Sequence, residues 1–220
     1  MKQLPLELPF RQVVGREHFI VSDCNAVAVA SIDRWPNWPG SCRALNIVGP
    51  PGAGKSHLAA IWQSMVQSSQ TLTGLAADQK LLPPTFYVLD NVACSPAWNE
   101  EELFHCFNRC ASETGGILLL SQIPVGQMNW QLPDLRSRMR AVNMALIDLP
   151  DDDLLFELLD KYFADRQILA PRAMLSYLVG RMERSFTAAH KLAAALDYRS
   201  AAEKKPLSVA LARAVFHELS

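Results

Sequence analysis

The sequence predicts an α/β fold: a parallel sheet with helices on both faces, followed by a small helical unit. Between residues 19 and 150, short apolar runs that suit buried strands alternate with helical patterns, which is typical of parallel sheets. From Asp151 onward the strand patterns stop, and apolar side chains recur at helical spacing. We therefore expect an extended arm over 1–18, an α/β domain over 19–150 and a helical lid over 151–220.

The expected elements follow from these patterns and from their end signals. Strands are predicted at 44–48, 71–75, 86–90, 116–121 and 145–150, with 71–75 the weakest pattern. Helices are predicted in the α/β domain at 24–35, from His57, at 100–112 and at 132–139, with Ser22 or Asp23 as the first N-cap. The lid is predicted to hold helices at 151–166, 171–183, 185–199 and 206–219, with Pro171 and Pro206 in first turns.

Composition limits the class of protein. The 220 residues are 50% hydrophobic, enough for one sizeable core and a small second unit. A net charge of −1, from 21 basic and 22 acidic residues, disfavours a strong, independent DNA-binding role but leaves room for a local basic patch. The N-terminus lacks an apolar signal core, and no window reaches the roughly 18 apolar residues of a membrane span. We expect a cytoplasmic protein without a membrane partner.

The five cysteines lack the paired spacing of a metal site. Cys106 and Cys110 are four residues apart and would share one helix face. We interpret the cysteines as small apolar core residues of a protein in a reducing cytosol.

Residues 49–56 read Gly-Pro-Pro-Gly-Ala-Gly-Lys-Ser, the G-x-x-x-x-G-K-S pattern of a phosphate-binding loop between a strand and a helix. Backbone N–H groups and the following helix N-terminus favour a phosphate there, with Lys55 neutralising the β- and γ-phosphates and the Ser56 hydroxyl holding Mg²⁺. The predicted contacts to ADP or ATP come from Pro51, Gly52, Ala53, Gly54, Lys55, Ser56 and His57. The alternative is a glycine-rich turn that binds nothing.

Asp90 ends an apolar strand, where a carboxylate can hold Mg²⁺ through water. Asn91 follows it, and an amide cannot accept a proton from an attacking water. This pair indicates binding without fast turnover, so the chain is predicted to be a weak or inactive ATPase. Without a nucleotide site, Asp90 would be a cap or turn residue.

Two further segments suggest partners. Residues 132–139 place Arg136 and Arg138 in one short helix, from which an arginine can reach the γ-phosphate of a neighbouring subunit, unless both are simply solvated. The arm carries Gln3, Leu4, Leu6 and Leu8, whose alternation suits docking in an extended form. An edge strand or a frayed tail explains the arm equally well.

Four features together resemble the DnaA-related AAA+ regulators called Hda. These are Gly-Lys-Ser-His-Leu over 54–58, Leu-Asp-Asn-Val over 89–92, the box 132–138 and the clamp-binding type of arm over 3–8. The resemblance covers nearly the whole chain. It implies an AAA+ P-loop core with a helical lid, and an adenine contact at Phe19, Ile20 and Val21, for which aromatic and branched side chains are suited.

The resemblance also implies a negative regulator of replication initiation. Such a protein binds the sliding clamp of DNA polymerase III through its arm, holds ADP, and stimulates hydrolysis of DnaA-bound ATP. Arg138 would then act in trans on the nucleotide of DnaA. The chain ends at Ser220 without a helix-turn-helix domain, so sequence-specific DNA binding is not expected, while a homodimer remains open.

Two positions depart from this family. At the end of the strand over 116–121, this chain reads Ser-Gln-Ile before Pro124, where relatives commonly carry Ser-Asp-Arg. Gln122 therefore alters the polar sensor. Thr187 stands where many relatives carry a sensor arginine, and Arg184 is the nearby candidate to replace it. The lost arginine weakens the expected discrimination between ATP and ADP.

Three other functions compete with this one. An autonomous ATPase of the helicase-loader or clamp-loader type is disfavoured by Asn91 and Thr187. An initiator-like DNA-binding protein is disfavoured by the near-neutral charge. A small P-loop metabolite kinase would leave the arm and the Arg138 box unexplained.

Overall fold

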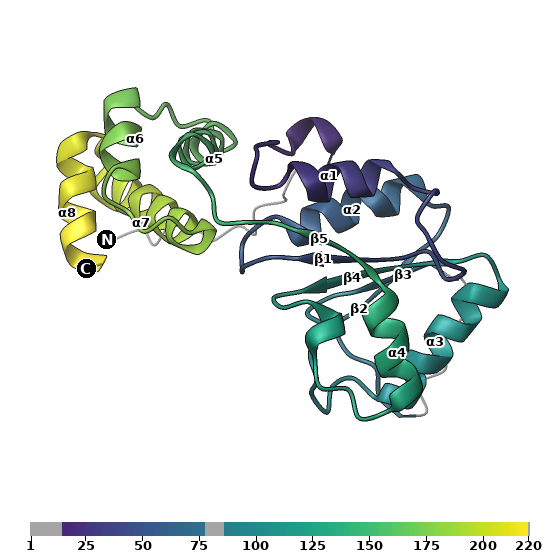
Figure 1. Cartoon of the computed structure of the whole chain (residues 1–220). Coiled ribbons are helices and arrows are strands. Elements are labelled where there is room, and N and C mark those ends of the chain that lie inside the picture. Colours follow the sequence, from purple (N-terminus) through teal and green to yellow (C-terminus); the bar gives the residue numbers. More distant parts are fainter. Residues whose placement is uncertain (1–14, 78–85, 220) are drawn as a thin grey trace. The chain divides into compact units, whose positions relative to one another are not determined.

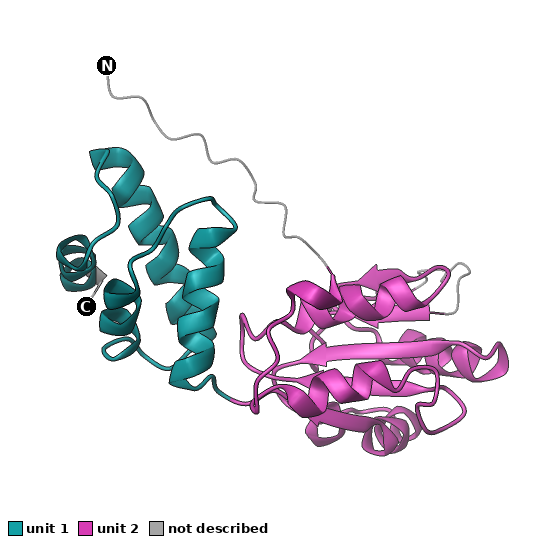
Figure 2. Cartoon of the chain, turned by 90° about the horizontal axis from the view of Figure 1, so that it is seen from above, with its two compact units in different colours: residues 1–13, 149–220 teal, residues 14–148 magenta. Residues whose placement is uncertain are grey.

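The computed structural model describes residues 15–77 and 86–219. The chain divides into two compact units, coloured separately in Figure 2. We call the part within 14–148 the sheet unit and the part within 149–220 the helical unit. No helix among the described residues is long and apolar enough to cross a membrane.

The sheet unit is built on five parallel strands in the order β2-β3-β4-β1-β5. Its elements run η1 (Arg16–His18), α1 (Ala26–Asp33), β1 (Ala44–Val48), α2 (Lys55–Met65), β2 (Gln70–Leu72), β3 (Phe86–Leu89), α3 (Glu100–Ser112), β4 (Gly116–Ser121), η2 (Val125–Gln127), α4 (Pro133–Ala141) and β5 (Asn143–Leu146). Helices α1 and α2 cover one face of the sheet, and α3 and α4 cover the other (Figure 1). The predicted α/β class and the parallel sheet are confirmed.

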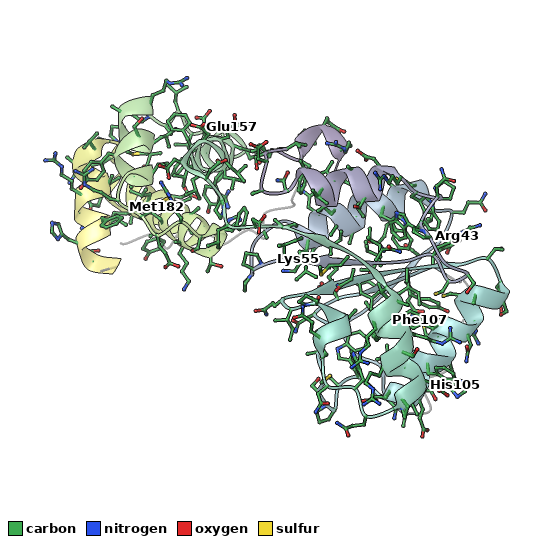
Figure 3. All side chains as sticks on the ribbon, viewed as in Figure 1. Arg43, Lys55, His105, Phe107, Glu157 and Met182 are labelled. Atoms are coloured by element: carbon green, nitrogen blue, oxygen red, sulfur yellow. The ribbon has the colours of Figure 1, made fainter. Side chains whose placement is uncertain are left out.

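The two central strands, β1 and β4, are buried at every residue because both faces of the sheet are covered. Their register pairs Ala44 with Ile117 and Val48 with Ser121. The core on the α3 side includes Phe107, which lies between α3 and the sheet (Figure 3). Strand β5 is an edge strand and leaves Met144 and Leu146 about half exposed.

The helical unit has four helices among its described residues: α5 (Asp152–Ala164), α6 (Arg172–Val179), α7 (Phe186–Glu203) and α8 (Val209–Leu219). Side chains cap three of them, since Asp151 Oδ1 accepts from Leu154 N at 2.7 Å, Ser185 Oγ from Ala188 N at 3.0 Å and Ser208 Oγ from Leu211 N at 3.2 Å. The unit has its own core, which includes Leu155, Leu159 and Phe163.

Several predicted boundaries were wrong. The expected strand 145–150 lies at 143–146, and 71–75 shortens to 70–72. The first helix begins at Ala26 after Asn25, so neither Ser22 nor Asp23 is its N-cap. Pro171 is itself an N-cap, and Pro206 lies before the helix that starts at Val209.

Cys42, Cys106 and Cys110 are buried, as expected of apolar core residues, whereas Cys94 is exposed and Cys24 is half-buried. All five cysteines are free thiols. The hydrogen bond to Cys110 and burial raise the pKa of Cys42, while the hydrogen bond to Cys106 and burial raise the pKa of Cys110, so neither is a reactive thiolate. Within the described ranges, no group of three or more His, Cys, Asp or Glu side chains could hold a metal ion.

Candidate functional site

The candidate site lies at the carboxyl edge of the sheet, where parallel strands deliver their following loops to one place. The glycine-rich loop follows β1, Asp90 follows β3, and Ser121 ends β4. The hydrogen bond from Gly49 N to Ser121 O, at 3.1 Å, ties the loop to the end of β4. The sheet therefore brings the loop and the neighbouring strand ends together.

The loop has the backbone shape that its glycines permit. Gly52 and Gly54 have φ of 79° and 82°, a region that disfavours other residues. Gly54 is the N-cap of α2, so the first N–H groups of this helix open into the loop. A Cβ at Gly54 would lie 3.0 Å from Phe19 Cε2, so another residue here would press on the Phe19 ring as well as strain the φ. The result is a cradle of backbone N–H groups at a helix N-terminus, the geometry that binds phosphate.

Lys55 lies inside this loop. Its Nζ donates to the carbonyl oxygens of Gly49 at 2.7 Å and Pro50 at 2.8 Å. Burial lowers the pKa of Lys55, and the Asp90 carboxylate opposes this shift. Figure 3 labels Lys55 on the ribbon of the sheet unit. A half-buried ammonium with a nearby carboxylate is a strong attractor for a polyphosphate and its metal ion.

The residues at hand fit a magnesium ion. Ser56 lies in the first turn of α2 with an exposed side chain, and Asp90 directly follows β3. A hydroxyl, a carboxylate and water are the oxygen ligands that Mg²⁺ accepts. Ser56 and Asp90 would hold the ion, whose charge neutralises that of phosphate oxygens when it is bound.

The expected adenine segment lies beside the loop. Phe19 packs edge-to-face on His57, with ring centroids 5.3 Å apart. His57 Nε2 lies 3.1 Å from the Gly15 carbonyl oxygen, which requires the tautomer protonated at Nε2. Ile20 is half-buried and Val21 is 47% exposed. Ala53 is buried, while Pro51 and Gly52 are exposed on the rim.

Asn25 is a site residue that the sequence analysis missed. It is buried at 3% exposure, its Nδ2 donates to Ile20 O at 3.0 Å, and its Oδ1 accepts from Ser22 N at 3.0 Å. These bonds fix the segment that carries Phe19, Ile20 and Val21. Ser22, Asp23 and Asn25 are all polar, and nothing in the sequence indicates that Asn25 is the one whose side chain is buried.

The two residues at the end of β4 have different surroundings. Ser121 is buried at 1% exposure and takes part in the hydrogen bonds at the loop, whereas Gln122 is exposed. Asn91 is exposed with a φ of 57°, a conformation that asparagine tolerates better than most residues.

The two arginines of α4 have different surroundings. Arg138 Nη2 donates to Asn108 Oδ1 at 2.5 Å, and its guanidinium carbon lies 4.9 Å from the centre of the Phe104 ring. The side chain of Arg136 is exposed and has no hydrogen bond, ion pair or ring contact within the part of the chain that the structure describes. In this structure, the predicted finger Arg138 is therefore held against α3.

The remaining predicted residues belong to the helical unit and to the arm. Arg184, in the helical unit, forms a two-pronged ion pair with Asp152 at 2.9 Å for each bond, which raises its pKa. Thr187 lies in the first turn of α7. Gln3, Leu4, Leu6 and Leu8 fall outside the described residues.

A search with protein-family models finds no match to this sequence. A search of curated proteins finds no match either. Solved structures do match in three dimensions. Domain III of the replication initiation protein DnaA from Thermotoga maritima gives a TM-score of 0.78 at 17% identity, over 96% of this chain and 98% of that one.

Two longer proteins match over part of their length. AMPPCP-bound DnaA from Aquifex aeolicus gives a TM-score of 0.65 at 16% identity, over 86% of this chain and 66% of that one. The RuvB Holliday junction branch migration motor of Thermotoga maritima gives 0.63 at 17% identity, over 80% and 61%. The chain therefore has the AAA+ fold of DnaA domain III and RuvB, a P-loop parallel-sheet core with a small C-terminal helical unit.

Proposed function

We propose that this protein is an Hda-like regulator that binds nucleotide, docks on the sliding clamp and stimulates hydrolysis of DnaA-bound ATP. The observation that carries the proposal is a phosphate cradle with its lysine, hydroxyl and carboxylate in place, followed by Asn91 where a proton acceptor would be needed for turnover. Such a site holds a nucleotide and hydrolyses it slowly, so the chemistry takes place on a partner.

The bound nucleotide is ADP or ATP with Mg²⁺. Support comes from the open first turn of α2, from Lys55 and Asp90, and from Phe19 against Gly54 and His57. The AAA+ fold adds to this, because one matched DnaA structure holds AMPPCP. Replacement of the expected sensor arginine by Thr187, together with the engagement of Arg184 by Asp152, favours a site that discriminates weakly between ATP and ADP.

Arg138 is the proposed finger, acting on the nucleotide of DnaA. To do so it leaves Asn108 and Phe104 when the partner binds, and the phosphate charge of the partner's nucleotide replaces the hydrogen bond and the ring interaction. Arg136, exposed on the same helix, is the alternative finger.

The test is hydrolysis of DnaA-bound ATP in the presence of clamp loaded on DNA. Arg138→Ala should lower the stimulated rate roughly 100-fold or to the unstimulated rate, while folding, clamp binding and ADP affinity stay unchanged. Arg136→Ala, two residues away on the same helix, should keep full stimulation. Loss of activity only in Arg136→Ala would move the finger to that residue.

The substitution Asn108→Ala tests whether Arg138 acts as a finger or only has a structural role. If Arg138 only ties α4 to α3, removing Asn108 will reproduce the defect of Arg138→Ala, because both substitutions break the same hydrogen bond. If Arg138 acts on the partner, Asn108→Ala should keep at least the wild-type rate. No stimulation by the wild type, with normal clamp binding, would contradict the regulatory function itself.

Clamp binding is proposed to reside in the arm. The double substitution Gln3→Ala with Leu6→Ala should abolish binding to the sliding clamp in surface plasmon resonance, because the amide and the leucine are the expected pocket groups. Glu7→Ala, between the alternating leucines, serves as the matched control and should bind normally. Clamp affinity retained in the double variant would exclude the arm as the docking segment.

The second candidate, an autonomous ATPase of the helicase-loader or clamp-loader type, is favoured by the intact phosphate cradle alone. Steady-state ATP turnover by the purified protein tests it. A rate of about 1 per second or more without any partner would favour this candidate over the regulator.

A further inference from the structure

Asn46 is a polar residue in the middle of an otherwise apolar buried strand, β1. It is only 1% exposed and faces the side of the sheet that η2 and α4 cover. A buried amide must find hydrogen-bond partners, because leaving it unpaired is costly. The hydrogen-bond partners of Asn46 therefore indicate the role of this side chain.

The Asn46 amide joins three segments. Nδ2 donates to Leu119 O at 3.1 Å and to Ser121 Oγ at 2.9 Å, both on β4. Oδ1 accepts from Val125 N, the first residue of η2, at 3.1 Å. One side chain therefore connects β1 to the end of β4 and to the start of η2.

On one side, these bonds lead to the phosphate-binding loop. Ser121 accepts from Asn46 through its hydroxyl and from Gly49 N through its carbonyl at 3.1 Å. The carbonyl of Gly49 in turn accepts from Lys55 Nζ at 2.7 Å. Each of these groups is in direct contact with the next, from the amide to the lysine.

On the other side, the bonds lead to the arginine-bearing helix. Val125 O accepts from Trp130 Nε1 at 2.7 Å, and this indole is 1% exposed. The next residue, Gly126, approaches α4 so closely that a Cβ there would lie 3.1 Å from Met139 O and 3.2 Å from Arg140 Cα. Because η2 and α4 meet backbone to backbone, a shift of η2 is passed to α4.

We propose that Asn46 is a positioning residue that couples occupancy of the phosphate-binding loop to the placement of η2 and α4, and hence of Arg136 and Arg138. The coupling rests on the proposed function, in which an arginine of α4 acts on a partner. It adds to that function a route by which the protein's own nucleotide controls the arginines.

The chemistry of the amide explains why asparagine serves here. Asn46 must donate to a carbonyl and a hydroxyl while it accepts from a backbone N–H, which needs both halves of an amide. Leucine has the same branched shape, with methyl groups in place of the amide oxygen and nitrogen, and offers neither a donor nor an acceptor. Asn46→Leu therefore cuts the connection while keeping the branched shape of the side chain.

The Trp130 indole N–H is a probe for this route on the chain alone. Its two-dimensional ¹H–¹⁵N NMR signal is assigned with Trp130→Phe, and amides of Gly52 and Gly54 report on the loop. On addition of ADP and Mg²⁺ to the wild type, we expect both the loop signals and the Trp130 signal to shift. In Asn46→Leu, we expect the loop signals to shift as before and the Trp130 shift to fall at least twofold.

Two further variants keep the result interpretable. Ser121→Ala removes the hydroxyl link but leaves the bond to Val125, so it replaces Asn46→Leu if that variant does not fold, and the same twofold loss is expected. Ile32→Val is a buried substitution on α1, away from the route, and should leave both shifts intact. In the hydrolysis assay, Asn46→Leu should lower the maximal stimulated rate at least fivefold while ADP affinity stays within twofold.

Three results would overturn the proposal. An undiminished Trp130 shift in folded Asn46→Leu or Ser121→Ala shows that the amide carries no coupling. A wild-type Trp130 signal that stays fixed while the loop amides move overturns the coupling and leaves the nucleotide site standing. Loop amides that do not respond to ADP at all overturn the nucleotide site, and the coupling with it.

Discussion

The surroundings of the Lys55 ammonium group are explained by the phosphate that the loop is proposed to bind. Its ammonium group is half-buried and bonded to Gly49 O and Pro50 O, although burial alone disfavours its charge and lowers its pKa. The loop holds the lysine where β- and γ-phosphates would arrive. The free-energy cost of burying the Lys55 ammonium is thus the cost of holding it ready for a phosphate.

Lys55→Ala should weaken ADP binding by 100-fold or more, about 3 kcal/mol, because the cradle then lacks its one full positive charge at the phosphates. Isothermal titration calorimetry measures this directly. Lys191→Ala, an exposed lysine on α7, is the control and should bind ADP as the wild type does. Unchanged ADP affinity in Lys55→Ala would mean that the nucleotide is not bound at this loop.

The sequence alone does not decide which of Arg136 and Arg138 is the arginine finger. Both lie in one predicted helix, and spacing alone favours neither as the finger. The structure separates them, since Asn108 and Phe104 on α3 contact Arg138 and leave Arg136 exposed. These contacts join residues about thirty positions apart, which no local pattern contains.

Among the elements, helix α4 depends on a side chain from another helix. The Glu100 carboxylate accepts from Gln131 N at 3.0 Å and Leu132 N at 2.6 Å, so it caps the start of α4 from the first turn of α3. Leu132, the N-cap residue itself, has no side-chain oxygen to do this. The position of the arginine helix is therefore set partly by α3.

Glu100→Ala should lower the free energy of unfolding by about 1 kcal/mol, through the loss of two hydrogen bonds to a charged acceptor. Equilibrium urea unfolding measures the change. Glu101→Ala removes an acid from the same first turn of α3 without touching α4, and should change stability by less than about 0.5 kcal/mol. Equal effects of the two substitutions would contradict the cap.

Strand β5 shows why an element boundary can escape sequence reasoning. The apolar run 145–150 suggested a buried strand, but the paired residues are 143–146. β1 leaves the sheet for the phosphate loop after Val48, which pairs with Leu146, so the ladder ends there. At the other end, Asn143 is polar and both Asn143 and Met144 are exposed on the edge, so no buried apolar residue marks where the strand begins.

At the scale of the whole molecule, the two units have separate hydrophobic cores. The helical unit buries Leu155, Phe163 and Leu192 with their neighbours in one cluster of its own. Its helices also carry their own side-chain caps at Asp151 and Ser185. Folding of the helical unit can thus be tested by itself.

The fragment 149–220 should be helical by circular dichroism and should unfold in a cooperative thermal transition, because its core and caps are internal. Phe163→Ala should abolish the transition, since such a cavity costs about 3–5 kcal/mol in a unit of this size. Leu169→Ala, at a leucine that is 95% exposed, is the control and should unfold as the fragment does. A gradual, non-cooperative loss of signal from the fragment would show that the unit needs the rest of the chain.

The sequence by itself determined the α/β class, the parallel sheet, and the glycine-rich loop with Lys55 and Ser56 at the start of the next helix and Asp90 at the end of a strand. Apolar runs such as 44–48 and 116–121 are periodic local signals, and the loop is a contiguous motif, so both are legible without a structure. The sequence signal for helix α3 is equally local, and its predicted bounds of 100–112 agree with the structure.

Only the tertiary structure decided which polar groups turn inward. Asn25 is buried, although its partners Ile20 and Ser22 are local. Asn46 looks ordinary in the sequence, yet it is buried and bonded to β4 and η2, which the fold brings to it. The same holds for Glu100 at α4 and for Arg138 against α3. Hydrogen bonds between residues 30 to 79 positions apart depend on how strands pair and helices pack, and that information is spread over the whole chain.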